Sequence, residues 1–210
     1  MSKVEEKAAF FDVDNTLINT KSLLSFLDFM IEKDHKNINK YEAFKINLKQ
    51  MFINNQPREL INRHYFSVLR GHNVEYIKQL AELWVNEQIE NKYFFNYELL
   101  GRVERFKKDN LRIVLVTGSF EAILEPLNRY LKADDILCSE PEIIDGIYSG
   151  ELTGAACIGE GKRQAVLKYA LMHNICIEES WAFGDDDTDI PMLETVGHGV
   201  RVEPSSLAVA

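Results

Sequence analysis

A short apolar run that ends in two carboxylates is the feature that most constrains the fold of this chain. Residues 8–11 read Ala-Ala-Phe-Phe, and Asp12 and Asp14 follow within the segment Phe-Asp-Val-Asp-Asn-Thr-Leu. A continuous apolar run of this kind is typical of a parallel strand that is buried on both faces. In open α/β sheets ligands bind at the carboxyl ends of the strands, so the run predicts that both carboxylates lie at a functional edge.

Two carboxylates one residue apart also have a structural interpretation. Their repulsion is costly unless a cation or a reacting group uses the charge. Asp and Asn, however, commonly cap helices and form turns. Taken alone, Asp12 and Asp14 leave the chemical and the structural interpretation open.

Apolar runs alternate with amphipathic stretches along the rest of the chain. Buried strands are predicted at 112–116, 135–138, 181–183 and 199–202, and helices at 121–131 and 163–173. Strands that alternate with helices of this length form βαβ units on a parallel sheet. The predicted fold class is therefore α/β, with a Rossmann-like parallel sheet core and helices on both faces.

Residues from about 20 to 97 break this alternation. They contain no convincing strand, their apolar positions recur at helical spacing, and Pro57 stands where a helix would begin. We predict a helical cap domain at 20–97, inserted into a core domain formed by 1–19 and 98–210. We expect the aromatic side chains of the insertion to form mainly its own core. A hairpin is predicted near 142–152, where Asp145-Gly146 supplies the turn.

Composition excludes several classes of protein. A net charge of −9 over 210 residues argues against nucleic-acid binding, although a local basic site for a small anion is compatible with it. Cys138, Cys157 and Cys176 are widely spaced, which favours reduced thiols over disulfides or a zinc site. The polar N-terminus is unlike a signal peptide, and no apolar run is long enough to span a bilayer. We expect a cytoplasmic protein that binds neither nucleic acid nor membrane.

Three further segments place polar residues at predicted strand ends or helix starts. Val-Thr-Gly-Ser at 116–119 suits an anion, because free backbone N–H groups point outward at such a turn, although Ser119 could simply cap the helix. Lys162 opens a helix and could face a phosphate, yet a lone lysine is usually a solvated surface residue. Residues 183–189 carry four acids in five positions, which suits Mg²⁺ but also an acidic loop that caps a helix.

Taken together and in this order, the four segments favour the chemical interpretation over the structural one. Asp-x-Asp-x-Thr, then hydrophobic-Thr-Gly, then Lys, then Gly-Asp-x-x-x-Asp resembles the four motifs of the haloacid dehalogenase superfamily, over nearly the whole chain. The helical insertion after the first strand, the spacing of Lys162 from Asp185 and the Asp-Gly hairpin resemble its phosphoserine-phosphatase-like branch.

The resemblance implies a role for each matching residue. Asp12 would be the nucleophile that forms an aspartyl-phosphate, and Asp14 the general acid and base. Thr117 and the N–H of Gly118 would hold the phosphoryl oxygens, and Lys162 would neutralise them.

The resemblance also implies a Mg²⁺ cofactor. Asp12, the carbonyl of Asp14 and Asp185 would bind the ion, and Asp189 would hold it through water or Lys162. Such charge cancellation is what a carboxylate needs in order to approach a phosphate dianion. An acid at position 14 favours a leaving alcohol that needs a proton.

Two departures from the family pattern concern the substrate and the metal loop. Phosphoserine phosphatases carry a Glu nine residues after the nucleophile that contacts the substrate amino group, and Lys21 stands there in this chain. A cation would repel an ammonium and attract a carboxylate or a second phosphate, unless Lys21 points to solvent. Asp186 and Thr188 replace a Gly and an Asn of the last motif. Arg58, Arg63 and Arg70 are further cap candidates for recognising substrate charge.

Three functions remain open at this stage. The preferred one is a Mg²⁺-dependent phosphatase that hydrolyses a phosphate monoester of a small metabolite, with phosphoserine itself disfavoured. A phosphotransferase or mutase would use the same aspartyl-phosphate. A non-catalytic binding module is disfavoured, because none of the motif residues is missing. The identity of the substrate and the oligomeric state are not determined by the sequence.

Overall fold

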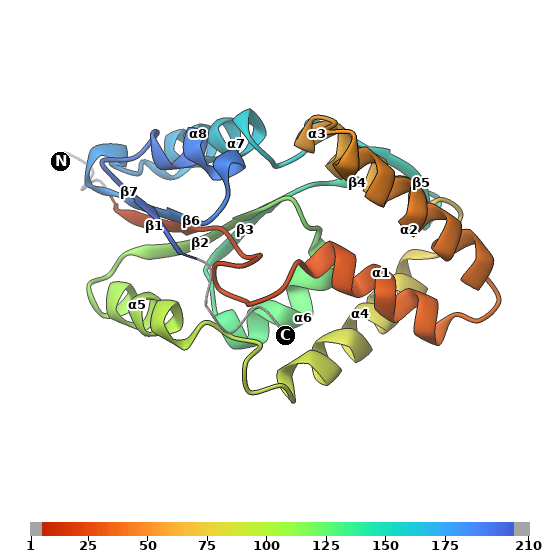
Figure 1. Ribbon diagram of the computed structural model, residues 1–210. Coiled ribbons are helices and arrows are strands. Elements are labelled where there is room, and N and C mark those ends of the chain that lie inside the picture. Colours follow the sequence, from red (N-terminus) through yellow and green to blue (C-terminus); the bar gives the residue numbers. More distant parts are fainter. Residues whose placement is uncertain (1–5, 204–210) are drawn as a thin grey trace.

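A computed structural model of the chain describes residues 6–203 (Figure 1). The outermost parts of the two predicted core segments, 1–5 and 204–210, lie outside the described residues. Within the described part, no helix is both long and apolar enough to cross a membrane.

The core is a five-stranded parallel sheet. Its strands are β3 (Asp135–Cys138), β2 (Arg112–Thr117), β1 (Ala8–Phe11), β6 (Trp181–Gly184) and β7 (His198–Arg201), in that spatial order. The first strand in sequence therefore lies at the centre, with β2 and β6 on either side. The predicted fold class is confirmed, and the predicted strands are present within one residue of their expected ends.

Helices cover both faces of the sheet (Figure 1). One face carries α5 (Tyr97–Lys108) and α6 (Glu121–Leu131), and the other carries α7 (Glu160–His173) and the short α8 (Ile190–Leu193). Neighbouring residues of β1 point to opposite sides: Phe11 stacks on Phe183 at 4.7 Å between ring centroids, and Phe10 meets Tyr169 edge-on at 6.0 Å. Burial on both faces explains why the strands are continuous apolar runs.

The insertion after β1 is helical. It contains α1 (Ser22–Lys33), α2 (Ile38–Ile53), α3 (Arg58–Tyr65), a 3₁₀ turn η1 (Phe66–Leu69) and α4 (Val74–Ile89), with Pro57 directly before α3 as predicted. Its larger aromatic side chains are mostly buried in a hydrophobic cluster that continues into the core, where α4 packs against α6. The division into two domains at residues 20 and 97 stays a prediction.

A two-stranded hairpin joins the insertion to the core. Its strands β4 (Pro141–Ile144) and β5 (Ile147–Leu152) are connected by Asp145 and Gly146, whose φ angles of 51° and 78° fit a type I′ turn. The hairpin is hydrogen-bonded to the segment before α4: the N–H of Gly71 donates to the carbonyl of Tyr148, and the N–H of Val74 donates to that of Gly146. Two further 3₁₀ turns, η2 (Ile177–Glu179) and η3 (Asp187–Asp189), flank β6.

Phe120 connects the insertion, the hairpin and the core. Its ring packs at 5.7–6.3 Å from those of Phe26, Phe66 and Tyr148, and its side chain is 1% exposed. We expect Phe120→Ala to lower the free energy of unfolding by about 3–5 kcal/mol. The substitution leaves a cavity, and the insertion, the hairpin and the core cannot all move in to fill it. Urea denaturation followed by circular dichroism measures the change.

The matched control is Leu171→Ala, because Leu171 on α7 is 86% exposed. This variant should change stability by no more than about 0.5 kcal/mol. A loss below about 1 kcal/mol in Phe120→Ala would contradict the packing described here.

Candidate active site

The chain turns sharply after β1 and keeps both aspartates at the edge of the sheet. The N–H of Asp12 continues the sheet by donating to the carbonyl of Phe183 at 2.8 Å. The carbonyl of Val13 then accepts from three consecutive N–H groups, those of residues 16–18, around Asn15 in the left-handed region with φ of 57°. Asn tolerates that conformation better than most residues, which explains why Asn follows the second aspartate of the motif.

Lys162 lies at the centre of the site. It belongs to the first turn of α7, and its Nζ donates to Oδ1 of Asp12 and, at 2.6 Å, to Oδ1 of Asp189. The three side chains are at most 7% exposed. The alternative that Lys162 is a solvated surface residue is therefore wrong.

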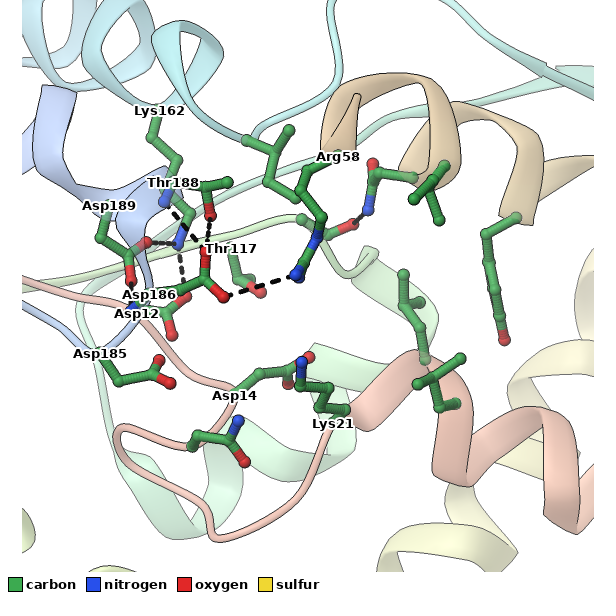
Figure 2. A pocket seen from close by; sticks show the side chains of 18 of the residues that line it. Asp12, Asp14, Lys21, Arg58, Thr117, Lys162, Asp185, Asp186, Thr188 and Asp189 are labelled. Carbon is green, nitrogen blue, oxygen red and sulfur yellow. Dashed lines mark hydrogen bonds and ion pairs between the residues drawn. The ribbon is translucent and has the colours of Figure 1, made fainter. Parts of the chain in front are cut away.

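Three carboxylates converge beside Lys162. Oxygens of Asp12, Asp185 and Asp189 all lie within 4.8 Å of one another (Figure 2). One ammonium cannot balance three carboxylates, so the cluster retains excess negative charge in a largely buried place. Hard carboxylate oxygens at such spacing fit Mg²⁺, and the donor set agrees with the predicted ligands. A buried Oδ1 of Asp14 at the same edge has no hydrogen-bond partner among residues 6–203.

Burial and mutual repulsion shift the pKa values of these groups. Burial raises the pKa of the Asp12 carboxyl; attraction to Lys162 opposes the rise, and repulsion by Asp189 and Asp14 adds to it. Burial raises the pKa of Asp14 to about 6, and it also raises that of Asp185. For Lys162 burial acts to lower the pKa, but attraction to the two carboxylates outweighs it and raises the pKa, so Lys162 is charged.

The Thr-Gly-Ser turn at the end of β2 is held from the insertion. The Thr117 hydroxyl oxygen accepts from the N–H of Ser119 at 3.1 Å, which leaves its proton available to a ligand. Nδ2 of Asn62 on α3 donates to the carbonyl of Gly118 at 2.9 Å, and its Oδ1 accepts from the buried Ser139 hydroxyl. The hydroxyl of Ser22 on α1 donates to that of Ser119. Ser119 therefore joins two segments and is not the N-cap of α6, a position that Phe120 occupies.

Asp186 and Thr188, the two departures in the last motif, stabilise their own loop. Oδ1 of Asp186 accepts from the N–H and the hydroxyl of Thr188, both at 3.0 Å. The backbone N–H of Asp186 donates to Oδ2 of Asp189. Burial acts to raise the pKa of Asp186, but these hydrogen bonds and the charge of Arg58 lower it. Arg58, at the start of α3, forms a 3.5 Å ion pair with Asp186 across the site (Figure 2).

The catalytic candidates and one side of the insertion line a common cavity of about 100 Å³. Lys21 lies beside Asp14 in its wall, and Arg58 lies opposite (Figure 2). Arg63 and Arg70 are not in that wall: Arg63 donates to the carbonyl of Gly154 at 2.7 Å, and Arg70 pairs with Glu151. Of the predicted cap arginines, Arg58 alone lines the cavity.

Asn62 and Tyr65 are among the cavity residues that are absent from the set that the sequence predicts. Both lie on α3, and together with Arg58 and Ile61 they occupy positions i, i+3, i+4 and i+7 of one helix face. That spacing is visible in the sequence once α3 is known to begin after Pro57. Which way the face points is decided by packing, so the sequence carries no signal for it.

Comparison with known proteins identifies the family. The model of the haloacid dehalogenase-like hydrolases matches residues 9–194. The chain therefore belongs to this family, as the sequence predicts.

Relatives in the family include named phosphatases. A probable phosphatase of Mycobacterium tuberculosis is 28% identical over 202 residues, covering 94% of this chain and 69% of the relative. A phosphoserine phosphatase of the same organism, SerB1, is 25% identical over 203 residues, covering 95% and 65%. These relatives support the prediction of a phosphatase of the haloacid dehalogenase type.

Solved structures confirm the fold. A protein of unknown function from Bordetella pertussis Tohama I has a TM-score of 0.85 at 20% identity, covering 97% of this chain and 92% of that one. A substrate-bound phosphoserine phosphatase has a TM-score of 0.65 at 18% identity, covering 93% and 85%. The arrangement of sheet and insertion is thus shared with phosphoserine phosphatases.

The contact between Gly118 and Asn62 predicts a coupled pair of substitutions. A Cβ on Gly118 would lie 2.8 Å from Nδ2 of Asn62. We expect Gly118→Ala to cost about 1–3 kcal/mol of unfolding free energy through this overlap. In an Asn62→Ala background the same change should cost at least about 0.5 kcal/mol less, because the atom that it meets is gone.

A double-mutant cycle by urea denaturation measures this coupling. The control is Gly101→Ala in α5, where nothing lies within 4 Å of the added Cβ and a small gain in stability is expected. Equal costs of Gly118→Ala in both backgrounds would contradict the contact.

Proposed function

We propose that this protein is a Mg²⁺-dependent phosphatase that hydrolyses small phosphate monoesters through an aspartyl-phosphate on Asp12. One observation carries the proposal: a buried carboxylate at the end of the central strand meets both a charged lysine and two further carboxylates. A carboxylate attacks a phosphate dianion only where cations cancel the repulsion, and this site concentrates the groups that do so.

Asp12 and Asp14 divide the chemistry. An Oδ of Asp12 attacks phosphorus, the bond from phosphorus to the leaving oxygen breaks, and Asp14 gives that oxygen a proton. Asp14 then takes a proton from the water that attacks the aspartyl-phosphate, which releases inorganic phosphate and restores Asp12. A pKa of about 6 suits Asp14 to both steps, because it can hold and release a proton near neutral pH.

Lys162 and the Thr-Gly turn orient the phosphoryl group. Lys162 holds Asp12 by a hydrogen bond and presents positive charge where phosphoryl oxygens would lie. The Thr117 hydroxyl and the N–H of Gly118 supply further donors, and Asn62 fixes the turn that carries them.

Mg²⁺ would be held by Asp12, Asp185 and the carbonyl of Asp14, with Asp189 supporting the set. Bound there, the ion would neutralise phosphoryl charge. Asp189 already accepts from Lys162 and from the N–H of Asp186, so its orientation is fixed without the ion.

The leaving group would lie between the catalytic edge and the insertion. Lys21, in the cavity wall beside Asp14, supports selection against a substrate ammonium, which is why we do not propose phosphoserine as the substrate. Arg58 replaces Arg63 in the proposed substrate-binding set, because Arg58 lines the cavity and Arg63 is bonded elsewhere.

Removal of the nucleophile tests the reaction. Asp12→Asn keeps the size of the side chain, and we expect phosphate release from p-nitrophenyl phosphate to fall by at least about three orders of magnitude. The control is Asp187→Asn, because the Asp187 side chain is 80% exposed and pairs with Arg201 outside the site. Phosphate release without any added acceptor distinguishes hydrolysis from phosphoryl transfer. Activity of Asp12→Asn within tenfold of the parent would refute the covalent role.

Metal dependence has a readout that does not need activity. At a free Mg²⁺ concentration of about 100 times the dissociation constant, the ion should raise the free energy of unfolding by about 2.7 kcal/mol. This change is measured as a rise in Tm that EDTA reverses. Asp185→Asn should lose the rise, whereas Asp187→Asn should keep it. An equal rise in both variants would place the ion elsewhere.

A further inference from the structure

The cavity is lined by charged groups from the core and by mostly apolar side chains from the insertion. The strand ends contribute its carboxylates, the first turn of α7 contributes Lys162, and the insertion contributes its far wall. Most of that wall consists of apolar side chains from three helices: Leu23, Leu24, Leu48, Phe52 and Ile61. It also contains the charged Lys21 and Arg58 and the amide of Asn62. If the phosphate binds at the charged groups of the core, as the proposed function requires, the leaving group extends toward this mostly apolar wall.

Tyr65 places a single hydroxyl in that wall. The side chain is 1% exposed, and its hydroxyl has no hydrogen-bond partner among residues 6–203. Of the buried side-chain atoms without a partner in this part of the chain, those of Asp14 and Tyr65 line the cavity. Leaving a hydroxyl unsatisfied costs about 1–3 kcal/mol, so native proteins usually avoid it.

Two other polar aromatic side chains of the insertion, Tyr41 and Trp84, have partners, whereas the buried Nε2 of His64 has none among residues 6–203. The Tyr41 hydroxyl donates to Asp34 at 2.9 Å and lies 3.1 Å from Nε2 of His72. The indole N–H of Trp84 donates to the Ser25 hydroxyl at 3.1 Å. Of these two unpartnered aromatic side chains, Tyr65 lines the cavity and His64 does not.

Packing explains the ring of Tyr65 but not its hydroxyl. The ring meets Phe66 edge-on at 5.7 Å between centroids and Phe44 at 6.3 Å. A phenylalanine would make both contacts and leave no polar atom unsatisfied. The fold gains nothing from the oxygen, which leaves the contents of the cavity as its partner.

The hydroxyl is a donor. Burial raises the pKa of the phenol, and the negative charge of Asp14 adds to this rise, so the proton stays on the oxygen. An acceptor oxygen on the leaving group would therefore satisfy its proton. A neutral oxygen fits this position better than a carboxylate, because the Tyr65 hydroxyl already lies in the field of the Asp14 carboxylate, which would repel a second negative charge.

We propose that Tyr65 selects the leaving group of the substrate. The preferred substrate is a phosphate monoester of a short, mainly apolar alcohol that carries one neutral acceptor oxygen, a hydroxyl or keto group, which accepts from the Tyr65 hydroxyl. This inference is built on the phosphatase activity proposed above and adds the class of its leaving group.

Pairs of substrates with equal numbers of heavy atoms test this selection. Phosphate release is measured for 3-hydroxybutyl against 3-methylbutyl phosphate, and for other three- to five-carbon chains with a hydroxyl or keto oxygen moved along them. In the parent enzyme the oxygenated member should be preferred in kcat/KM at one position by roughly tenfold, the worth of one net hydrogen bond. In Tyr65→Phe this preference should fall to within twofold of unity.

Tyr41→Phe is the matched control. It removes the hydroxyl of another buried tyrosine of the insertion, one that is hydrogen-bonded to Asp34. This variant should lower the free energy of unfolding and leave the substrate preference unchanged. Tyr65→Phe should leave the free energy of unfolding unchanged or raise it, because it removes an unsatisfied group.

The outcomes separate this inference from the proposed function. If the parent hydrolyses p-nitrophenyl phosphate but prefers no oxygenated chain, or if Tyr65→Phe keeps the preference, the role of Tyr65 is overturned and the phosphatase stands. A marked loss of stability in Tyr65→Phe would also overturn it, because the hydroxyl would then serve the fold. If the parent releases no phosphate from any ester, the proposed function fails and the inference fails with it.

Discussion

The buried contacts of Lys162 with Asp12 and Asp189 are the interaction on which the site depends. Buried charges cost several kcal/mol each unless they are paired, and three carboxylates converge at this edge of the sheet. Lys162 offsets part of that charge and fixes the direction of the Asp12 carboxylate. The strand order brings these groups together, because β1 lies between β2 and β6 and the first turn of α7 faces the same edge.

The site divides its tasks between the two parts of the fold. The α/β core supplies charge at the edge of the sheet, where it can meet a phosphate. The helical insertion supplies a mostly apolar wall that also carries Lys21, Arg58 and the Tyr65 hydroxyl. Asn62 connects the two, because it reaches from α3 to the turn that would bind phosphoryl oxygens. The ion pair between Arg58 and Asp186 is partly exposed, so it contributes at most about 1 kcal/mol to this connection.

Prediction from the sequence succeeded where a signal is local. The strand β3 and the helix α6 have the predicted bounds, because a buried apolar run and an amphipathic repeat are each complete within a few residues. The Asp145-Gly146 turn is equally local, since its backbone needs residues that tolerate positive φ. The sequence did not separate Arg63 from Arg58: both are basic, but Arg58 lines the cavity, whereas Arg63 does not line it and donates to the carbonyl of Gly154. Charge is visible in the sequence, and direction is not.

The sequence by itself determined the fold class, the family and the order of the motif residues, because apolar periodicity and the residues at strand ends are properties of short segments. The tertiary structure decided which groups share the cavity. It placed Lys162 within hydrogen-bonding reach of Asp12, 150 positions apart, and left the Tyr65 hydroxyl without a partner beside that site. Such pairings depend on how whole elements pack, and packing is set by surfaces that no single segment contains.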